Sequence, residues 1–392
     1  MNIVVKLLII IGVLIPTIAN AQENEYISGS VYDKVTGETL ISASVYFDNL
    51  ADGTITNADG EFILRRIPDV DSLVFSYLGY APQKYSLTFI PSKIYLEPIA
   101  TNLPEIVVSA DYANKIVEQI WEKYNKISKE EIKQKKGKYS FFYRQITQSH
   151  GVYNEFIECF LTADNTHCID NLSLQEGRYA KIRKDSTVYF TFDNFYFMSQ
   201  IKPFRQKDAG KKTVNTFIQP NFKKLYYVDI EDRFSDEKGS ILVLNFHPRK
   251  QNVKDIAINA GKLYVRESDF SIIRFEGTSQ MNIKFQVIYK ERPNTYPIVE
   301  TVTCSLDSEK QYKKENQEII KYKVKITSVL FMVDQQFDDS GKKLNKKPLL
   351  EILNKKTYNP EFWKNNPIVK RTKIDENVIK EFEAANAFDV LN

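Results

Sequence analysis

Runs in which apolar and polar residues alternate fill most of the chain, and this pattern predicts a mainly β protein. Side chains on one face of a strand recur at every second residue, so each run fits a strand with one buried face. Turn-forming residues separate the first of these runs, which lie at 31–32, 42–47, 61–64, 72–77 and 93–96. We therefore expect a compact antiparallel β-sandwich over residues 24–100.

A helical period follows the sandwich. Ile116, Ile120, Tyr124 and their neighbour Trp121 are spaced so that they fall on one face of a helix. The pattern predicts a helix over residues 111–130, in which Trp121 packs against a sheet rather than holding a ligand.

Strand-like alternation returns at residue 139 and continues to residue 333. We expect residues 111–392 to form one domain, the helix plus a curled antiparallel β-rich body, because a meander of about ten strands has to curl into a barrel or around a helix. The alternation in 284–289 suits a sheet with one face in water. The predicted strands are 139–148, 152–163, 178–183, 187–197, 225–230, 241–246, 262–266, 272–276, 283–289, 298–305 and 319–333, with a hairpin turn at 267–269 and a short helix at 375–385.

Residues 1–21 have the features of a signal peptide. An apolar run follows Lys6, and the small residues of Ala19-Asn20-Ala21 predict cleavage before Gln22. An uncleaved membrane anchor is the alternative, but the run is shorter than the roughly 20 apolar residues that a span needs. We therefore expect an exported protein, in the periplasm or associated with the outer membrane, with no transmembrane segment in the mature chain.

Composition excludes several function classes. The chain has 54 Lys+Arg against 50 Asp+Glu, and a formal charge of +4 is too small for a nucleic-acid binder. It contains none of the glycine-rich phosphate-binding motifs and no Gly-x-Ser-x-Gly motif, so nucleotide binding and esterase chemistry have no support.

Three segments of the predicted sandwich carry a specific resemblance. They are residues 27–45 (ISGSVYDKVTGETLISASV), 53–62 (GTITNADGEF) and 74–80 (VFSYLGY). Together they resemble the carboxypeptidase-regulatory-like domain, a transthyretin-like β-sandwich that commonly begins exported proteins of diderm bacteria. Asn57 stands where the family usually has Asp, and a turn tolerates either residue.

The family name does not bring peptidase chemistry with it. Metallocarboxypeptidases hold zinc with two His and a Glu, two of them in a His-x-x-Glu motif. None of His150, His167 and His247 is followed by Glu at the third position, and Cys159, His167 and Cys168 match no zinc-binding spacing. We therefore expect no catalytic, cofactor-binding or metal-binding residues and no cofactor.

Two pairs of residues have structural interpretations. Cys159 is expected to be a buried thiol in a strand, while a Cys159–Cys168 disulfide across a hairpin stays open. The carboxylates of Glu155 and Glu158 are expected on a solvated face.

Residues 101–110 (TNLPEIVVSA) form a predicted linker that resembles the junction after the same sandwich in TonB-dependent outer-membrane transporters. A full transporter is not expected, because about 22 strands of roughly 9–11 residues, with loops and a plug, need a longer chain. The C-terminal part is instead similar to an outer-membrane-associated family of unknown function, through residues 139–144, 261–274 and 362–363.

Together these observations predict a non-enzymatic exported envelope protein that acts as a binding or structural module, with the sandwich as an accessory interaction domain. Its expected partners are an envelope protein or an apolar or lipid ligand, and not nucleic acid. Two alternatives stay open: a hydrolase whose catalytic residues are scattered along the chain, and a carrier that holds a lipid in a half-barrel sheet.

Overall fold

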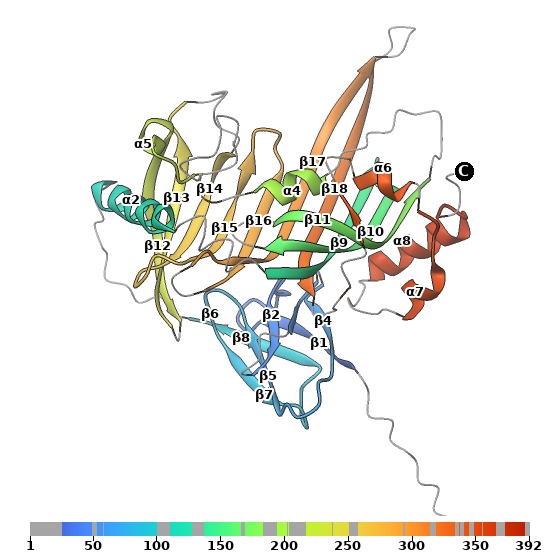
Figure 1. Ribbon diagram of the computed structural model, residues 1–392, viewed down its shortest axis with the longest axis horizontal. Coiled ribbons are helices and arrows are strands. Elements are labelled where there is room, and N and C mark those ends of the chain that lie inside the picture. The colour runs from blue at the N-terminus through green and yellow to red at the C-terminus, as the bar shows by residue number, and fades with distance from the viewer. Residues whose placement is uncertain are drawn as a thin grey trace, which may run out of the picture.

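A computed structural model defines the fold over most of the chain (Figure 1). It describes residues 26–48, 53–57, 59–99, 110–127, 137–165, 169–182, 194–201, 203, 217–236, 238–250, 258–292, 295–313, 319–333, 337, 341–344, 349–354, 356–365 and 373–388. The predicted signal peptide at 1–21 and all but the last residue of the predicted linker at 101–110 lie outside this part. No helix within it is long and apolar enough to cross a membrane.

The N-terminal domain is the expected β-sandwich, with two four-stranded sheets ordered β4-β1-β8-β6 and β3-β2-β5-β7. Apolar side chains that alternate along the strands fill the space between the sheets, among them Val31, Phe47 and Phe75, all fully buried. One pair differs from the antiparallel expectation, because β1 and β8 run parallel with Val31 opposite Ile94. The strands are β1 Tyr26–Asp33, β2 Ser44–Phe47, β3 Gly53–Ile55, β4 Glu61–Arg65, β5 Ser72–Ser76, β6 Tyr80–Ala81, β7 Gln83–Ser86 and β8 Lys93–Pro98.

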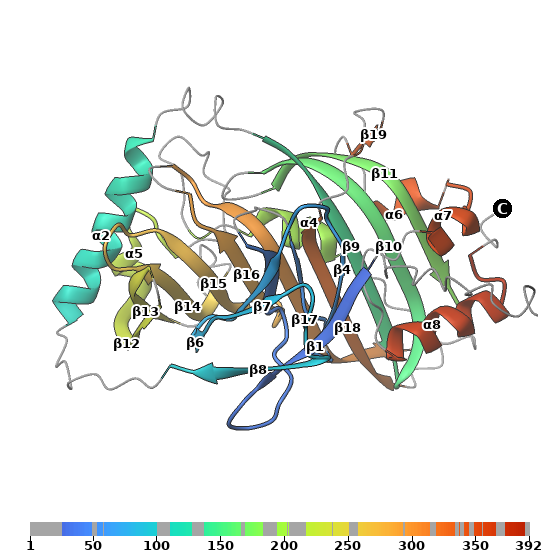
Figure 2. The same cartoon turned by 90° about the horizontal axis from the view of Figure 1, so that it is seen from below.

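The second domain is built on one eleven-stranded antiparallel sheet, ordered β12-β13-β14-β15-β16-β17-β18-β9-β10-β11-β19. Pairing of β18 with β9 joins the last long strand to the first and places both inside the sheet. The sheet curls, as Figure 2 shows, but it does not close into a barrel. Its strands are β9 Gly137–Ser149, β10 Val152–Asn165, β11 Ile169–Lys181, β12 Tyr226–Asp236, β13 Gly239–Pro248, β14 Ile258–Arg266, β15 Ile272–Ser279, β16 Lys284–Lys290, β17 Ile298–Lys313, β18 Ile319–Val333 and β19 Lys342–Lys343.

Most predicted strands of this domain are confirmed, including the β14–β15 hairpin, where the amide of Phe270 donates to the carbonyl of Arg266 across the turn. The strand predicted at 187–197 is wrong at its C-terminal end, since Asn194–Gln200 form the helix α4. Residues 187–193 lie outside the described part. The strand predicted at 178–183 is the end of a longer one, β11, which begins at Ile169.

Helices cover one face of the sheet, which we call the helix face (Figure 2). The predicted helix is α2, Ala110–Lys126, and it buries Ile116, Ile120 and Tyr124 in the main core. Trp121 is half-buried against the same core, as the pattern predicted. The other helices in this core are α4, α5 (Phe222–Leu225) and α6 (Leu349–Leu353).

The opposite face, which we call the sandwich face, was expected to meet water. Instead, the sandwich lies against its middle part and the C-terminal helices α7 (Pro360–Asn365) and α8 (Lys373–Ala384) lie against one end (Figures 1 and 2). The predicted helix at 375–385 is confirmed as α8, which buries Val378 and Phe382 beside Phe156. The alternating polar side chains of the sheet are therefore partly enclosed between two domains.

Candidate functional site between the sandwich and the sheet

Two apolar contacts join the sandwich to the sheet. Ile55 of β3 packs on an aromatic cluster of the sheet that includes Phe142 and Phe331. Leu78, in the turn before β6, packs on a second cluster that includes Phe234 and Val243. Because these contacts are at separate places on the sandwich face, they leave enclosed space around β3.

A large cavity of about 840 Å³ lies between the two domains. Its wall on the sandwich side comes from the residues around Ile41, Ile55 and Asn57. On the sheet side it is lined by side chains of the sandwich face from eight strands, including Ile146, Lys262, Glu276, Lys284, Gln286, Thr303, Ser305, Lys325, Thr327, Val329 and Phe331. The volume is within the range of about 300–1,000 Å³ that is usual for ligand pockets in proteins.

The large cavity combines an apolar side with cationic and hydroxyl groups. Neighbours already neutralise three of its charged groups: Arg144 pairs with Glu158 at 2.7 Å, Lys262 with Glu231 at 2.6 Å, and Glu276 with Arg274 at 2.6 Å. Two further cations, Lys284 and Lys325, are exposed and form no ion pair within the described residues. The cavity therefore offers positive charge beside an apolar wall.

A small cavity of about 490 Å³ is lined by all three residues of β3 and shares Ser42 and Ile55 with the large cavity. The sandwich contributes serine and tyrosine residues to its lining, among them Ser44, Ser76 and Tyr77. The sheet contributes charged residues at the ends of its strands and, on β17, Glu300 and Thr301.

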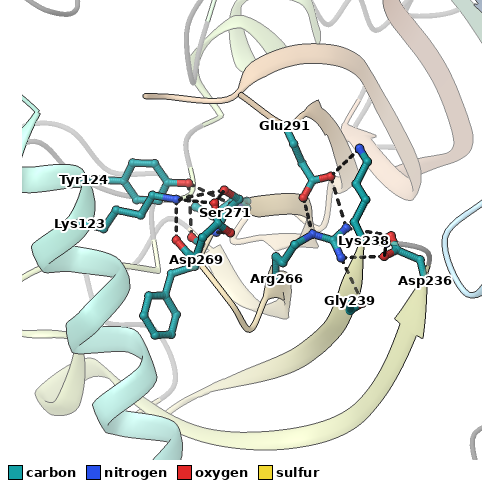
Figure 3. Close-up of polar contacts among 11 residues, drawn as sticks. Lys123, Tyr124, Asp236, Lys238, Gly239, Arg266, Asp269, Ser271 and Glu291 are labelled. Carbon is teal, nitrogen blue, oxygen red and sulfur yellow. Dashed lines mark hydrogen bonds and ion pairs between the residues drawn. The ribbon is translucent and has the colours of Figure 1, made fainter. Parts of the chain in front are cut away.

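Arg266 organises the charged rim of the small cavity (Figure 3). Its guanidinium donates to both carboxylate oxygens of Asp236, to both oxygens of Glu291 at 2.7 and 3.3 Å, and to the carbonyl of Gly239 at 3.1 Å. Lys238 completes the cluster with an ion pair to Glu291 at 3.1 Å. Burial alone would lower the pKa of Arg266, but these carboxylates hold it well above its ordinary value.

A second polar cluster in Figure 3 fixes α2 to the β14–β15 turn. Lys123 pairs with Asp269 at 3.3 Å and also donates to the hydroxyl of Ser271 at 3.0 Å. The hydroxyl of Tyr124 accepts from the amide of Ile272 at 3.1 Å, and burial raises its pKa above the ordinary value. Every contact in this cluster joins parts of the fold, so we assign it a structural role.

Glu300 and Thr301 are two adjacent polar residues of β17 that line the small cavity. The β16–β17 register shifts between Ile288 and Tyr289, which leaves Glu300 as an extra residue in β17. Its burial raises the pKa of its carboxyl, against the opposing charges of Lys290 and Lys238. The Thr301 side chain is 1% exposed, and its hydroxyl has no hydrogen-bond partner within the described residues.

Comparison with protein families identifies the first domain. Residues 27–108 match the family model of the CarboxypepD_reg-like domain. This confirms the resemblance found in the sequence, and it places one wall of both cavities in this domain. No curated protein matches the chain.

Three solved structures are similar to part of the chain. A putative outer membrane lipoprotein-sorting protein domain from Vibrio parahaemolyticus has 9% identity and a TM-score of 0.28, over 62% of this chain and 99% of that chain. A LolA superfamily protein from Nitrosomonas europaea has 12% identity and a TM-score of 0.23, over 58% and 95%. A DUF1329 family protein from Desulfovibrio piger has 8% identity and a TM-score of 0.24, over 58% and 94%. TM-scores this low establish no common fold.

The histidines and cysteines considered as possible metal ligands or catalytic groups do not gather at the cavities. His150 is in the exposed β9–β10 turn, and His247 is exposed on β13, 3.8 Å from Asp229. Cys159 and Cys304 are buried, and burial raises the pKa of the Cys304 thiol. His167 and Cys168 lie outside the described residues, so the question of a Cys159–Cys168 disulfide lies outside them as well. The part of the chain that the structure describes holds no group of three metal-ligating side chains.

The expectation of a solvated face for Glu155 and Glu158 is wrong. Glu158 is fully buried between Arg144 and Arg178, with ion-pair distances of 2.7 and 2.5 Å. Glu155 is 1% exposed and accepts a hydrogen bond from the hydroxyl of Tyr179 at 2.8 Å. Their partners come from neighbouring strands, which the spacing of the two glutamates does not show.

Proposed function

We propose that this chain is a non-enzymatic binding protein of the bacterial envelope, and that the CarboxypepD_reg-like domain and the curled sheet together hold its ligand in the large cavity. The observation that carries the proposal is that both domains line one cavity of ligand size. In this arrangement the sandwich is one wall of the binding site as well as an accessory domain.

The chemistry of the large cavity favours an amphiphilic ligand with a negative charge. Ile41, Ile55 and Phe331 provide apolar surface, while Lys284 and Lys325 provide positive charge. An envelope lipid with an anionic headgroup has both features. The opposite, helix face is a less suitable lipid site because the protein's own side chains fill it, among them Phe217, Phe246 and Phe275.

Binding fits the charged groups of the large cavity better than catalysis does. Arg144, Lys262 and Glu276 are each held in an ion pair, so they are poorly placed to exchange protons with a substrate. The competing proposal is a hydrolase with scattered catalytic residues.

An envelope location rests on the predicted signal peptide and on the match to the CarboxypepD_reg-like domain.

Native mass spectrometry of the mature protein, purified from its own envelope, tests this function. We expect an excess mass that organic extraction releases as an anionic lipid. Ser305→Trp fills the floor of the large cavity and should abolish the excess mass. Ser235→Trp is the matched control, because Ser235 is exposed on β12 and lines neither cavity. An excess mass that persists in Ser305→Trp would place the ligand elsewhere, and no excess mass in the wild type would remove the basis of the proposal.

Cell fractionation tests the location independently. The protein should appear with periplasmic or outer-membrane fractions and start at Gln22 by N-terminal sequencing. Recovery from the cytoplasm with residues 1–21 intact would contradict it.

A further inference from the structure

We propose that the small cavity is a second binding site and that it takes a neutral polyhydroxylated molecule, a saccharide, through Glu300 and Thr301. This site differs from the proposed lipid site, because the two cavities share only Ser42 and Ile55 and neither Glu300 nor Thr301 lines the large one.

The hydroxyl of Thr301 is the first observation that indicates a ligand. It is buried and lines the cavity, yet no group within the described residues hydrogen bonds to it. A buried polar atom without a partner destabilises the fold, and valine has the same shape without this destabilising effect. A threonine at this position is therefore explained if a ligand supplies the missing hydrogen bond.

The carboxyl of Glu300 is the second observation. It is the extra residue of a β-bulge, a feature that often re-aims a side chain beside a functional site. It lines the small cavity and forms no hydrogen bond or close ion pair within the described residues. Carboxyl oxygens accept hydrogen bonds from hydroxyl groups, so Glu300 and Thr301 together form an adjacent pair of hydrogen-bonding groups on one wall.

The charge pattern favours a neutral ligand over an anion. The cations that line the small cavity already face carboxylates: Arg266 pairs with Asp236 and Glu291, Arg274 with Glu276 and Lys238 with Glu291. The fourth cation, Lys290, acts on Glu300 itself. An anion would have to compete with these carboxylates and would also meet Glu300. A saccharide needs no charge compensation.

The sandwich wall suits the same ligand class. Tyr46 and Tyr77 contribute aromatic rings with polar hydroxyls, which can contact both the C–H and the O–H groups of a sugar. Ser44 and Ser76 are opposite each other in the β2–β5 register and add two hydroxyls to the same wall. Hydrogen-bonding groups thus face the cavity from both domains.

Saturation-transfer NMR on the full mature chain tests the site, with maltose, cellobiose and diacetylchitobiose as probes and inorganic phosphate as an anionic competitor. We expect transfer to at least one disaccharide, undiminished by phosphate. Thr301→Val should weaken its binding by about tenfold or more, as loss of one hydrogen bond predicts, and should raise the melting temperature of the free protein. Glu300→Gln should weaken binding as well.

Thr303→Val is the matched control, since Thr303 is on the same strand and lines the large cavity instead. It should leave disaccharide binding unchanged, and so should Ser305→Trp, which separates this proposal from the proposed lipid site. No transfer to any of the three disaccharides would overturn the proposal. Equal affinity in wild type and Thr301→Val, or displacement of the sugar by phosphate, would overturn it too.

Discussion

Arg266 holds Asp236 through two parallel hydrogen bonds, from Nη1 to Oδ1 at 2.7 Å and from Nη2 to Oδ2 at 2.8 Å. This bidentate geometry is the strong form of an arginine–carboxylate pair. It links β14 to the end of β12 across the intervening strand β13, at the rim of the small cavity. Stability of this edge of the sheet should therefore depend on the charge of Asp236.

That dependence predicts a pH effect. Burial alone would raise the pKa of Asp236, but hydrogen bonds from Arg266 and from the Lys238 amide lower it below its ordinary value. A lowered pKa stabilises the fold above the unfolded pKa, about 3.9, and this contribution is lost as pH falls through the folded value. Asp236→Asn should therefore lower the free energy of unfolding at pH 7 by about 1–2 kcal/mol, which thermal unfolding reports as a lower melting temperature. The difference from wild type should shrink below about pH 4.

Asp307→Asn is the control for this experiment, because Asp307 is an exposed strand residue outside the Arg266 cluster. It should melt like the wild type at pH 7. A deficit in Asp236→Asn that is the same at pH 7 and pH 3 would show that the ion pair is not its source.

The apolar contact of Ile55 should decide whether the two domains stay together. Ile55→Asp places a carboxylate against the cluster of Phe142 and Phe331, which should cost about 2–3 kcal/mol of interdomain free energy. Because each domain has its own core, both should stay folded while small-angle X-ray scattering reports a larger radius of gyration. Val35→Asp is the control, since Val35 is 76% exposed on the sandwich. Equal radii for the two variants would contradict a docking role for Ile55.

The buried glutamate Glu158 should be among the most sensitive positions in the sheet domain. Glu158→Gln keeps the shape of the side chain but leaves the guanidinium groups of Arg144 and Arg178 without their counter-charge. This should lower the free energy of unfolding by about 3–5 kcal/mol. Arg178 also lies 4.6 Å from the ring centroid of Trp363, so α7 should lose protection in hydrogen exchange. Glu309→Gln, which breaks an exposed pair with Lys321, should cost under about 1 kcal/mol. Similar losses in the two variants would refute this difference.

Side-chain periodicity was sufficient to predict most of the fold. The stripe through Ile116 and Tyr124 identified α2, and strict alternation identified hairpins such as β14–β15. The prediction was wrong where the buried residues of a short segment fit both the strand period and the helix period. In α4, the buried residues Phe195, Phe197 and Met198 suit a strand at the 195–197 spacing and a helix at the 195–198 spacing. Packing on the helix face decided between them.

The candidate sites could not be predicted in this way. Thr301 and Thr303 alternate with buried residues just as solvent-facing residues do, and the pattern does not show that a second domain covers them. The role of Glu300 depends on a bulge, which no periodicity indicates. The ion pairs of Glu158 depend on which strands become neighbours, so the short spacing from Glu155 was misleading.

A close contact between two glycines should make β14 intolerant of any side chain at residue 261. Gly261 is opposite Gly277 in the register, and a Cβ on Gly261 would lie 2.1 Å from the carbonyl oxygen of Glu276 and 2.9 Å from the ring of Phe217. Since the nearest atom is backbone, the two strands would have to separate, and Gly261→Ala should cost about 2 kcal/mol or more. Lys262→Ala, at the next residue, removes only the half-exposed ion pair with Glu231 and should cost under about 1 kcal/mol. Thermal unfolding of the two variants measures the contrast, and a Gly261→Ala protein as stable as Lys262→Ala would show that β14 and β15 are not packed this closely.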